Sequence, residues 1–274
     1  MPELPEVETV ARTLRPRLVG RRVLSVATSG KKLRAPIDKQ AITRAAKGAT
    51  IDVVRRHAKY LVVELSSARV LLVHLGMTGR LTIVQASAPH APHTHVVLGL
   101  EGGEELRYVD PRRFGAIAVY RAADLARAPE LTVLGPDPLS DAFTLEQFRA
   151  ELRSSDRDLK QFLMDQSRVA GLGNIYVCEA LYRARISPRK RASSLSGSRA
   201  ELLRTHIREI LEQAIAHRGT TFRNYVDGGG EPGGNQMNLD VYGRQGEPCR
   251  ACGSPIGRIV QGARSTFFCR RCQK

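Results

Sequence analysis

The chain has 274 residues, of which 42% are hydrophobic, enough for packed cores and too many for wholesale disorder. Lysine and arginine outnumber aspartate and glutamate by 43 to 27, a formal net charge of +16 spread over the whole length. A folded basic chain usually binds a polyanion, so we expect nucleic acid as the partner. No apolar run is long enough for a membrane span and no secretory signal is present, so we expect a cytoplasmic protein with no membrane partner.

The first segment is expected to form a helix. Pro5 suits the first turn, Glu6 and Glu8 favour the positive end of the helix dipole, and Gly20 ends the apolar periodicity. Short apolar runs separated by turn residues then predict seven or eight strands in a sandwich or barrel. These runs are 23–27, 51–54, 60–65, 70–75, 95–100, 106–109 and 116–120.

Residues 133–143 have the glycine, proline and aspartate content of a linker, and helical periodicity follows at 144–165, 174–184 and 199–216. Thr144 with Gln147, and Ser198 with Glu201, have the spacing of capping boxes. Residues 227–234 contain five glycines and predict a mobile loop. We therefore expect a β domain at 1–132, a helical domain at 144–239 after the linker at 133–143, and a separate C-terminal module at 240–274.

Two pairs of cysteines with zinc-ligand spacing lie in the C-terminal module. Cys249 and Cys252 are separated by sixteen residues from Cys269 and Cys272, which is enough chain for a hairpin to bring four thiolates to one ion. Four thiolates leave no open position, so the predicted zinc is structural. The fifth cysteine, Cys178, lies on an apolar helix face and is expected to be buried.

The N-terminus is a candidate nucleophile. Removal of Met1 would expose Pro2 as a secondary amine, and an α-amino group has a pKa of about 8 against about 10.4 for lysine. Such an amine can attack a sugar carbon and form an iminium that drives elimination, with Glu3 and Glu6 as potential acid and base. The plainer alternative is that the Met-Pro start is only a processing signal and a helix start.

Five motifs occur in order along the chain: MPELPEVET at 1–9, HLGMTG at 74–79, DPRRFG at 110–115, GLGNIY at 171–176, and RSTF at 264–267 between the cysteine pairs. Together they closely resemble the formamidopyrimidine-DNA glycosylase family, bacterial enzymes that excise 8-oxoguanine and ring-opened purines. The resemblance implies an α+β multidomain fold with an N-terminal helix and β-sandwich, a helix–two-turn–helix module and a β-hairpin zinc finger. It also implies a monomer that binds double-stranded damaged DNA.

The resemblance further implies a bifunctional reaction, in which base excision precedes strand cleavage by β,δ-elimination through a Schiff base. Pro2 would attack the sugar C1′, Glu3 would handle protons at the sugar, and Lys59 and Arg264 would act as acids in the eliminations. The damaged nucleotide would be flipped out of the duplex. The residues that resemble DNA contacts are His74, Asn174, Lys59 and Arg264 at phosphates, Met77, Arg112 and Phe114 in the hole left by the extruded base, and His93, beside which His95 could serve instead.

Alternatives and departures remain. Without the resemblance, Met77 and Phe114 would be interpreted as core residues. Asp156 stands where the family often has a basic residue, Arg218 stands where a glycine is usual, and residues 233–236, in a loop region that holds the flipped base, lack an aromatic pair. The rivals are an endonuclease VIII-type enzyme for oxidised pyrimidines and a non-catalytic zinc-ribbon DNA-binding protein. The LPEVET start and the complete DPRRFG run favour the purine enzyme.

Overall fold

The computed structural model describes residues 2–274. By their contacts they divide into two compact units. Unit 1 comprises Met1–Thr132 and Ile215–Gln236, and unit 2 comprises Val133–Ala214 and Met237–Lys274. Within the described residues no helix is both long and apolar enough to cross a membrane.

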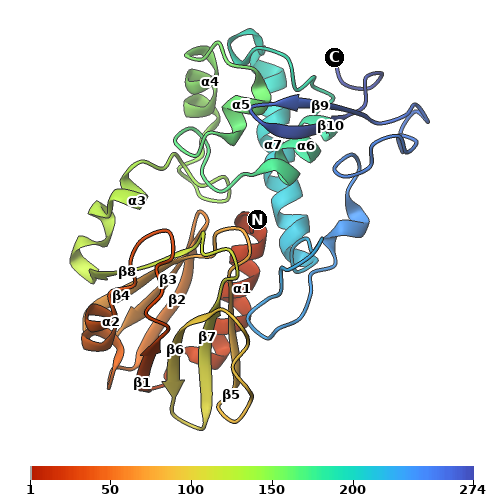
Figure 1. The fold of residues 1–274 in the computed structure, drawn as a ribbon. Coiled ribbons are helices and arrows are strands. Elements are labelled where there is room, and N and C mark those ends of the chain that lie inside the picture. The colour runs from red at the N-terminus through yellow and green to blue at the C-terminus, as the bar shows by residue number, and fades with distance from the viewer. Residues whose placement is uncertain (1) are drawn as a thin grey trace. The chain divides into compact units, whose positions relative to one another are not determined.

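Unit 1 is a β-sandwich of two four-stranded antiparallel sheets, with strand orders β1-β6-β7-β5 and β2-β3-β4-β8 (Figure 1). Inward-facing side chains of both sheets form one core with α1 and α2. This confirms the predicted sandwich and all seven strand runs. The elements are α1 (Leu4–Leu18), β1 (Val23–Thr28), α2 (Lys39–Ala46), β2 (Ile51–His57), β3 (Tyr60–Leu65), β4 (Arg69–His74), β5 (Arg80–Gln85), β6 (Thr94–Leu100), β7 (Glu104–Val109) and β8 (Ala116–Arg121).

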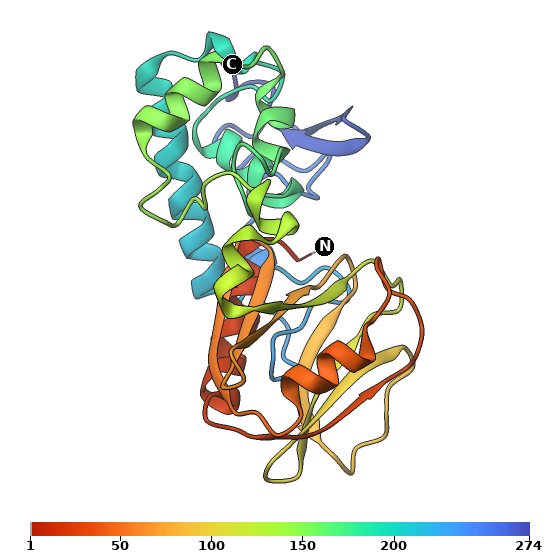
Figure 2. The same ribbon diagram turned by 90° about the vertical axis from the view of Figure 1, so that its left-hand side faces the viewer.

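Strand β5 and helix α2 of unit 1 were not expected from the sequence, nor was the single-turn helix at Pro129–Thr132. Strand β5 buries only the alternate residues Leu81 and Ile83, and Thr82 interrupts its apolar residues, so its apolar run is too short to stand out. Helix α2 buries little beyond Ile42 and two alanines, and it is started by Asp38, whose side chain accepts the amide hydrogen of Ala41. In Figure 2 this helix lies beside the strands of the sandwich as a short orange coil.

Helix α1 packs its apolar face on the sandwich core. Leu4, Val10 and Leu14 are fully buried, and the helix ends at Leu18 as its periodicity predicts. Pro16 is accommodated inside the last turn. The helix begins with Glu3 as its N-cap residue in a capping box with Glu6. This start fixes the direction in which Pro2 leaves the helix.

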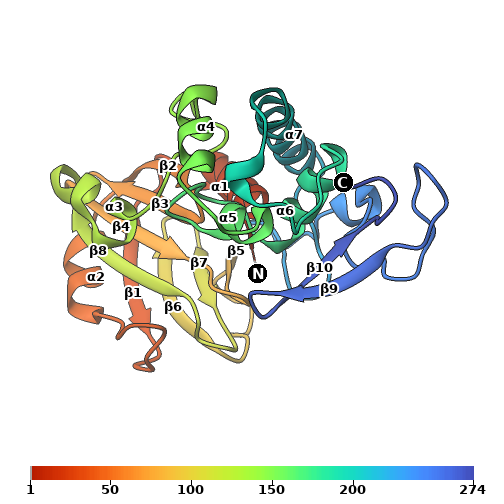
Figure 3. The same cartoon turned by 90° about the horizontal axis from the view of Figure 1, so that it is seen from above.

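Unit 2 is mainly helical and carries a two-stranded antiparallel hairpin (Figure 3). Thr144 caps α4 by accepting the amide hydrogen of Gln147 at 3.2 Å, as predicted. Asp158 starts a new helix in the same way, so the expected helix at 144–165 is two helices. The elements are α4 (Leu145–Arg153), α5 (Leu159–Met164), α6 (Asn174–Arg183), α7 (Gly197–Ala216), β9 (Gly257–Gln261) and β10 (Arg264–Phe268), preceded by α3 (Pro129–Thr132) at the end of unit 1.

The capping box predicted at Ser198 and Glu201 is wrong. Helix α7 begins at Gly197, and the amide of Ala200 already donates to the carbonyl of Ser196. Ser198 is therefore inside the helix, where it cannot act as the cap.

Candidate functional site

The start of α1 brings three of the predicted catalytic residues together in unit 1. Pro2, Glu3 and Glu6 are all buried, the two glutamates with only 3% and 1% exposure. One carboxylate oxygen of Glu6 accepts the amide hydrogen of Glu3, and the other accepts that of Thr220, both at 2.8 Å. Donors at a helix N-terminus stabilise a buried carboxylate. Glu6 thereby fixes the backbone next to Pro2.

Lys59 lies in the tight turn between β2 and β3 and is 6% exposed. The turn is linked to α1 by Arg56, which donates to the Glu8 carboxylate at 2.9 Å and to the carbonyl of Ala58 at 3.2 Å. Ala58 takes the left-handed conformation, with φ +50°, that the tight turn requires. The sequence did not single out Arg56, because an arginine in a strand has no local pattern that reveals its partners.

His74 ends β4 and pairs in register with Tyr60 of β3, the neighbour of Lys59. Its Nδ1 accepts the amide hydrogen of Gly76 at 3.0 Å. Burial, helped by the positive charges of Arg34 and Lys59, lowers the pKa of His74 to about 4. At neutral pH the ring is therefore uncharged and carries its hydrogen on Nε2, from which it can donate to an anion.

Two neighbouring loops hold the residues predicted to fill the hole in the DNA. Met77 and Phe114 are 39% and 44% exposed, so the alternative interpretation of both as core residues is wrong. The Arg112 guanidinium lies 4.5 Å from the centre of the Phe114 ring, within range of a cation–π contact. The structure thus presents an exposed group of apolar and cationic side chains on the loops that follow β4 and β7.

A buried aspartate holds these two loops together. Asp110 is fully buried and accepts hydrogen bonds from the Thr78 hydroxyl at 2.6 Å and from the Gly115 amide at 2.9 Å. The loops also touch at Gly76, which has φ +63°, and a side chain there would lie 2.5 Å from the backbone of Gly115. The positions of Met77 and Phe114 therefore depend on the Asp110 carboxylate, although Asp110 is adjacent to neither residue in the sequence.

The two histidines beside β6 differ in exposure. His95 is buried and bonds through its ring nitrogens to the Ser29 hydroxyl at 2.9 Å and to the carbonyl of Asp110 at 3.0 Å. His93 is exposed, with a left-handed backbone at φ +66°. Only His93 of this pair offers its ring to solvent, which favours it as the contact residue.

In unit 2, Asn174 and the zinc hairpin are joined directly. Asn174 is the first residue of α6, and its side-chain amide donates to the carbonyl of Ser265 at 2.9 Å, next to Arg264. Its Oδ1 is buried without a donor among residues 2–274. The carbonyl of Asn174 accepts from the buried Lys160 at 3.3 Å. Arg264 itself is exposed at the start of β10.

Basic side chains also gather in a shallow pocket of about 270 Å³ within unit 2. Lys160 and Arg157 contribute from the region of α5, and Arg264 contributes from the hairpin. Asp165 also lines this pocket and pairs with Arg157 at 3.0 Å, and the Lys160 ammonium is buried against the carbonyl of Asn174 and the sulfur of Cys178. Arg264 is the exposed cation of this pocket. Sequence analysis did not single out Lys160 or Arg157, because neither lies within the motifs.

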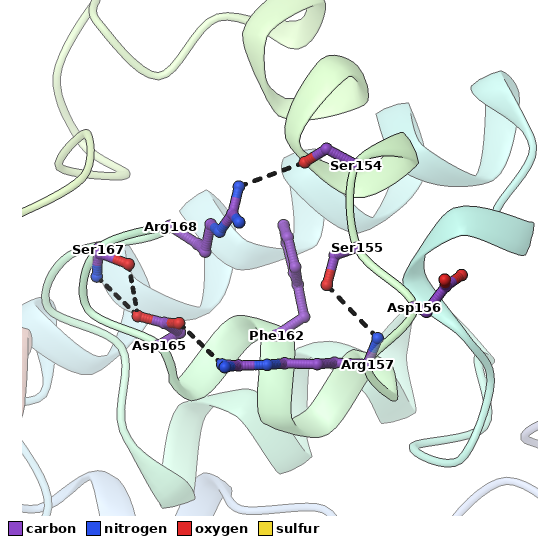
Figure 4. Close-up of a pocket in the computed structure, with 8 residues that line it drawn as sticks. All are labelled: Ser154, Ser155, Asp156, Arg157, Phe162, Asp165, Ser167 and Arg168. Carbon is purple, nitrogen blue, oxygen red and sulfur yellow. Dashed lines mark hydrogen bonds and ion pairs between the residues drawn. The ribbon is translucent and has the colours of Figure 1, made fainter.

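A larger pocket of about 430 Å³ lies beside Phe162, between the end of α4 and the turn after α5 (Figure 4). Its arginines are already paired, Arg157 with Asp165 at 3.0 Å and Arg168 with Glu151. Asp156, which departs from the family pattern, accepts from the Ser193 hydroxyl at 3.0 Å. With its charges paired internally, this pocket is not built to bind an anion.

The four C-terminal cysteines form a metal site. Their sulfur atoms all lie within 4.8 Å of one another, with Cys249 to Cys272 at 3.9 Å and Cys252 to Cys269 at 3.5 Å. Tetrahedral zinc with Zn–S bonds of about 2.3 Å places its sulfurs ~3.8 Å apart, so the four residues fit one structural Zn²⁺. Cys178 is buried and separate from this set, as predicted.

A buried glutamate fixes the segment that leads to the zinc site. Glu179 of α6 is 2% exposed and accepts the amide hydrogens of Asp240, Val241 and Tyr242 at 2.8 to 3.0 Å. Three amide donors satisfy the carboxylate and bind the chain to α6. Nothing in the local sequence around Glu179 reveals this contact, since its partners lie about sixty residues later.

Comparisons with known proteins agree over the whole chain. Residues 1–117 match the model of the formamidopyrimidine-DNA glycosylase N-terminal domain, 134–226 that of its H2TH domain, and 246–274 that of a zinc finger found in FPG and IleRS. A formamidopyrimidine-DNA glycosylase of Moorella thermoacetica is 48% identical over 94% of each chain, and one of Herpetosiphon aurantiacus is 45% identical over 100% of each. A Lactococcus lactis Fpg, solved with abasic-site DNA, is 36% identical over 99% of each chain, with a TM-score of 0.93.

We predict that Cys252→Ser loses the metal. Removing one of four thiolates should lower bound zinc from one ion per chain to well below one, and the hairpin should loosen because it has little core of its own. Elemental analysis of purified protein measures this. Cys178→Ala is the matched control and should keep one zinc. Full zinc occupancy in the Cys252 variant would contradict the ligand assignment.

We predict a pH-dependent stability from His74. The pKa of this ring is about 4 in the folded protein against about 6.5 in an unfolded chain, so the unfolded state binds more protons between these values. The free energy of unfolding should fall as the pH decreases from about 6.5 to about 4. In His74→Gln the fall should be smaller, as measured by urea unfolding at pH 4.5 and 7. His90→Gln is the control, and an unaltered pH profile in the His74 variant would disprove the assignment.

Proposed function

The chain belongs to the formamidopyrimidine-DNA glycosylase family, and from that premise we propose which of its residues carry out the reaction. The enzyme removes oxidised purines, including formamidopyrimidines, from damaged duplex DNA and cleaves the strand at the resulting abasic site. The observation that carries the assignment of roles is the buried start of α1, where Pro2, Glu3 and Glu6 are held together.

Pro2 is the nucleophile. After removal of Met1, the nitrogen of Pro2 attacks the sugar C1′, and the bond from C1′ to the base breaks as the base leaves with a proton. The C1′–O4′ bond then breaks and O4′ takes up a proton, which opens the sugar and leaves the nitrogen doubly bonded to C1′ as an iminium. The iminium accepts electrons from the neighbouring C–H bond. Loss of that proton expels the 3′ phosphate, and a second elimination expels the 5′ phosphate. Glu3 moves protons at the sugar, which its burial beside Pro2 favours.

Lys59 and Arg264 are the proposed acids for the two eliminations. Each carries a positive charge that can bind the phosphate and stabilise it as it leaves. Glu6 does not have the role of an acid, because both of its carboxylate oxygens already accept backbone amide hydrogens. We assign it to positioning Pro2 and Glu3. The neutral His74 and Asn174 add uncharged hydrogen bonds to phosphate.

Met77, Arg112 and Phe114 are proposed to occupy the space left by the extruded base. Their exposure and the stacking of Arg112 on Phe114 support this, because an apolar wedge backed by a cation can replace base stacking. His93 is proposed as a further DNA contact. The loop that follows α7, at 217–236, is proposed to receive the flipped base.

We retain 1–132 as the catalytic part, 133–143 as a linker, 144–239 as the helical DNA-binding part and 240–274 as the zinc finger. The four cysteines would hold the zinc, whose only contribution is to fold the hairpin that carries Arg264. We propose that the enzyme works as a monomer in the bacterial cytoplasm, where its DNA substrate lies. The endonuclease VIII alternative shares the same nucleophile, so a panel of lesion duplexes separates the two activities.

Borohydride trapping tests the nucleophile. Reduction of the iminium should link the protein covalently to an abasic duplex, and peptide mapping should find the link at the Pro2 nitrogen. Pro2→Gly, which replaces the secondary amine by a primary one, should reduce trapping, and a chain that retains Met1 should lose it. A non-catalytic DNA-binding protein would give no adduct at all, and an undiminished adduct on a lysine would refute the role of Pro2.

The wedge is tested with Phe114→Ala. Unstacking a base costs a few kcal/mol, so the variant should excise 8-oxoguanine opposite cytosine much more slowly yet cleave an abasic duplex almost normally. Because the ring is 44% exposed, the melting temperature should change little. A buried core phenylalanine would instead cost about 3–5 kcal/mol of stability. Equal loss on both substrates with a lowered melting temperature would therefore contradict the wedge.

A further inference from the structure

The loop at 217–236 begins with an unusual backbone. Arg218 has φ +61° and Gly219 has φ +79°, so two consecutive residues are left-handed directly after α7. The left-handed region is unfavourable for a residue with a long side chain and is ordinarily left to glycine. An arginine at 218 therefore has an unfavourable backbone conformation that a glycine at this position would not have.

The Arg218 side chain forms an ion pair with Asp227. The Arg218 guanidinium donates to Oδ2 of Asp227, whose carboxylate is fully buried. The other oxygen, Oδ1, accepts the amide hydrogens of Gly229 at 2.9 Å and Glu231 at 3.1 Å. A buried carboxylate is stable only when it is hydrogen-bonded and paired, and Arg218 supplies the positive charge.

The turn around Asp227 is itself anchored on the sandwich. The Gly228 amide donates to the Thr13 hydroxyl of α1 at 2.9 Å, and its carbonyl accepts the Ile83 amide of β5 at 3.0 Å. A side chain at Gly228 would collide with Leu14, so the turn lies directly against α1. Figure 1 shows this light-blue segment running beside α1. The ion pair thus ties the start of the loop to a turn that is anchored on α1 and β5.

Between the two tied positions lies an exposed segment. Phe222, Arg223 and Asn224 are exposed, with 53% exposure for Phe222. On its C-terminal side the hydroxyl of Tyr225 donates to the carbonyl of Arg218 at 3.1 Å. Residues 222–224 are therefore the tip of a closed loop whose two ends are joined through Arg218.

We propose that the Arg218–Asp227 ion pair is a positioning device that holds residues 222–224 in a fixed conformation for the extruded purine. The inference rests on the proposed function, in which this loop receives the flipped base. Because an abasic site has no base to receive, the pair should govern excision of damaged purines and have no part in strand cleavage at abasic sites. The Arg218 side chain acts on the loop through its ion pair with Asp227, so Arg218 is a positioning residue.

Two variants test the effect of the ion pair apart from that of the backbone conformation. Arg218→Gly removes the guanidinium but suits φ +61°, so the fold should survive. Asp227→Asn keeps an oxygen for the amides of Gly229 and Glu231 and removes the charge. Each should lower single-turnover excision of 8-oxoguanine by about tenfold, as expected for loss of a charged hydrogen bond, with abasic cleavage within about twofold of wild type. The double variant should be no slower than either single one, and Arg218→Lys should restore part of the rate.

The matched control is Arg55→Ala, which breaks the ion pair of Arg55 with Glu64 at 2.8 Å on β2 and β3 of the same unit. It should leave both activities unchanged. Hydrogen–deuterium exchange of the free protein gives a readout independent of catalysis: amides at 222–234 should exchange faster in the Arg218 and Asp227 variants than in wild type, whereas the strands should not change.

Unaltered exchange in both variants, or equal loss of excision and abasic cleavage, would overturn the inference. A wild-type protein inactive on both substrates would instead refute the proposed function, and the exchange experiment would still show whether the pair holds the loop.

Discussion

The hydrogen bonds that the Glu6 carboxylate accepts hold together the part of unit 1 in which the proposed catalytic residues Pro2 and Glu3 lie. The carboxylate joins the amide of Glu3 to that of Thr220, two positions more than two hundred residues apart in the chain. A charged group with 1% exposure is stable there because both oxygens accept amide hydrogens at the positive end of α1. The proposed nucleophile and the loop proposed to receive the base are therefore both held by hydrogen bonds to the same carboxylate.

Three other buried carboxylates also hold chain segments in place through hydrogen bonds. Asp110 joins the two loops that present Met77 and Phe114, Asp227 closes the loop after α7, and Glu179 fixes the segment before the zinc site. In each case the acid binds backbone amides that no helix or sheet satisfies. A chain with a net charge of +16 uses its few buried acids to shape loops, and leaves its basic side chains to meet the DNA.

The residues proposed to contact DNA are not uniformly charged. His74 is neutral at physiological pH because burial and two nearby cations lower its pKa, and Asn174 carries no charge. Uncharged hydrogen bonds from such groups would orient a phosphate. The positive charges of Lys59 and Arg264 would attract it electrostatically, and salt would weaken that attraction. The hairpin bearing Arg264 is too small for a core of its own, and four thiolates around zinc take the place of that core.

The sequence by itself determined the parts that depend on local pattern. Short apolar runs separated by turn residues predicted seven strands, cysteine spacing predicted the zinc site, and the ordered motifs predicted the family. Patterning did not find α2 and β5, whose apolar residues are interrupted by polar ones, and it placed the start of α7 two residues late. Only the tertiary structure decided that Phe114 is exposed, that His74 is neutral, and that Arg218 reaches Asp227. Each of these depends on neighbours distant in sequence, and burial and charge pairing exist only once those neighbours have been brought together.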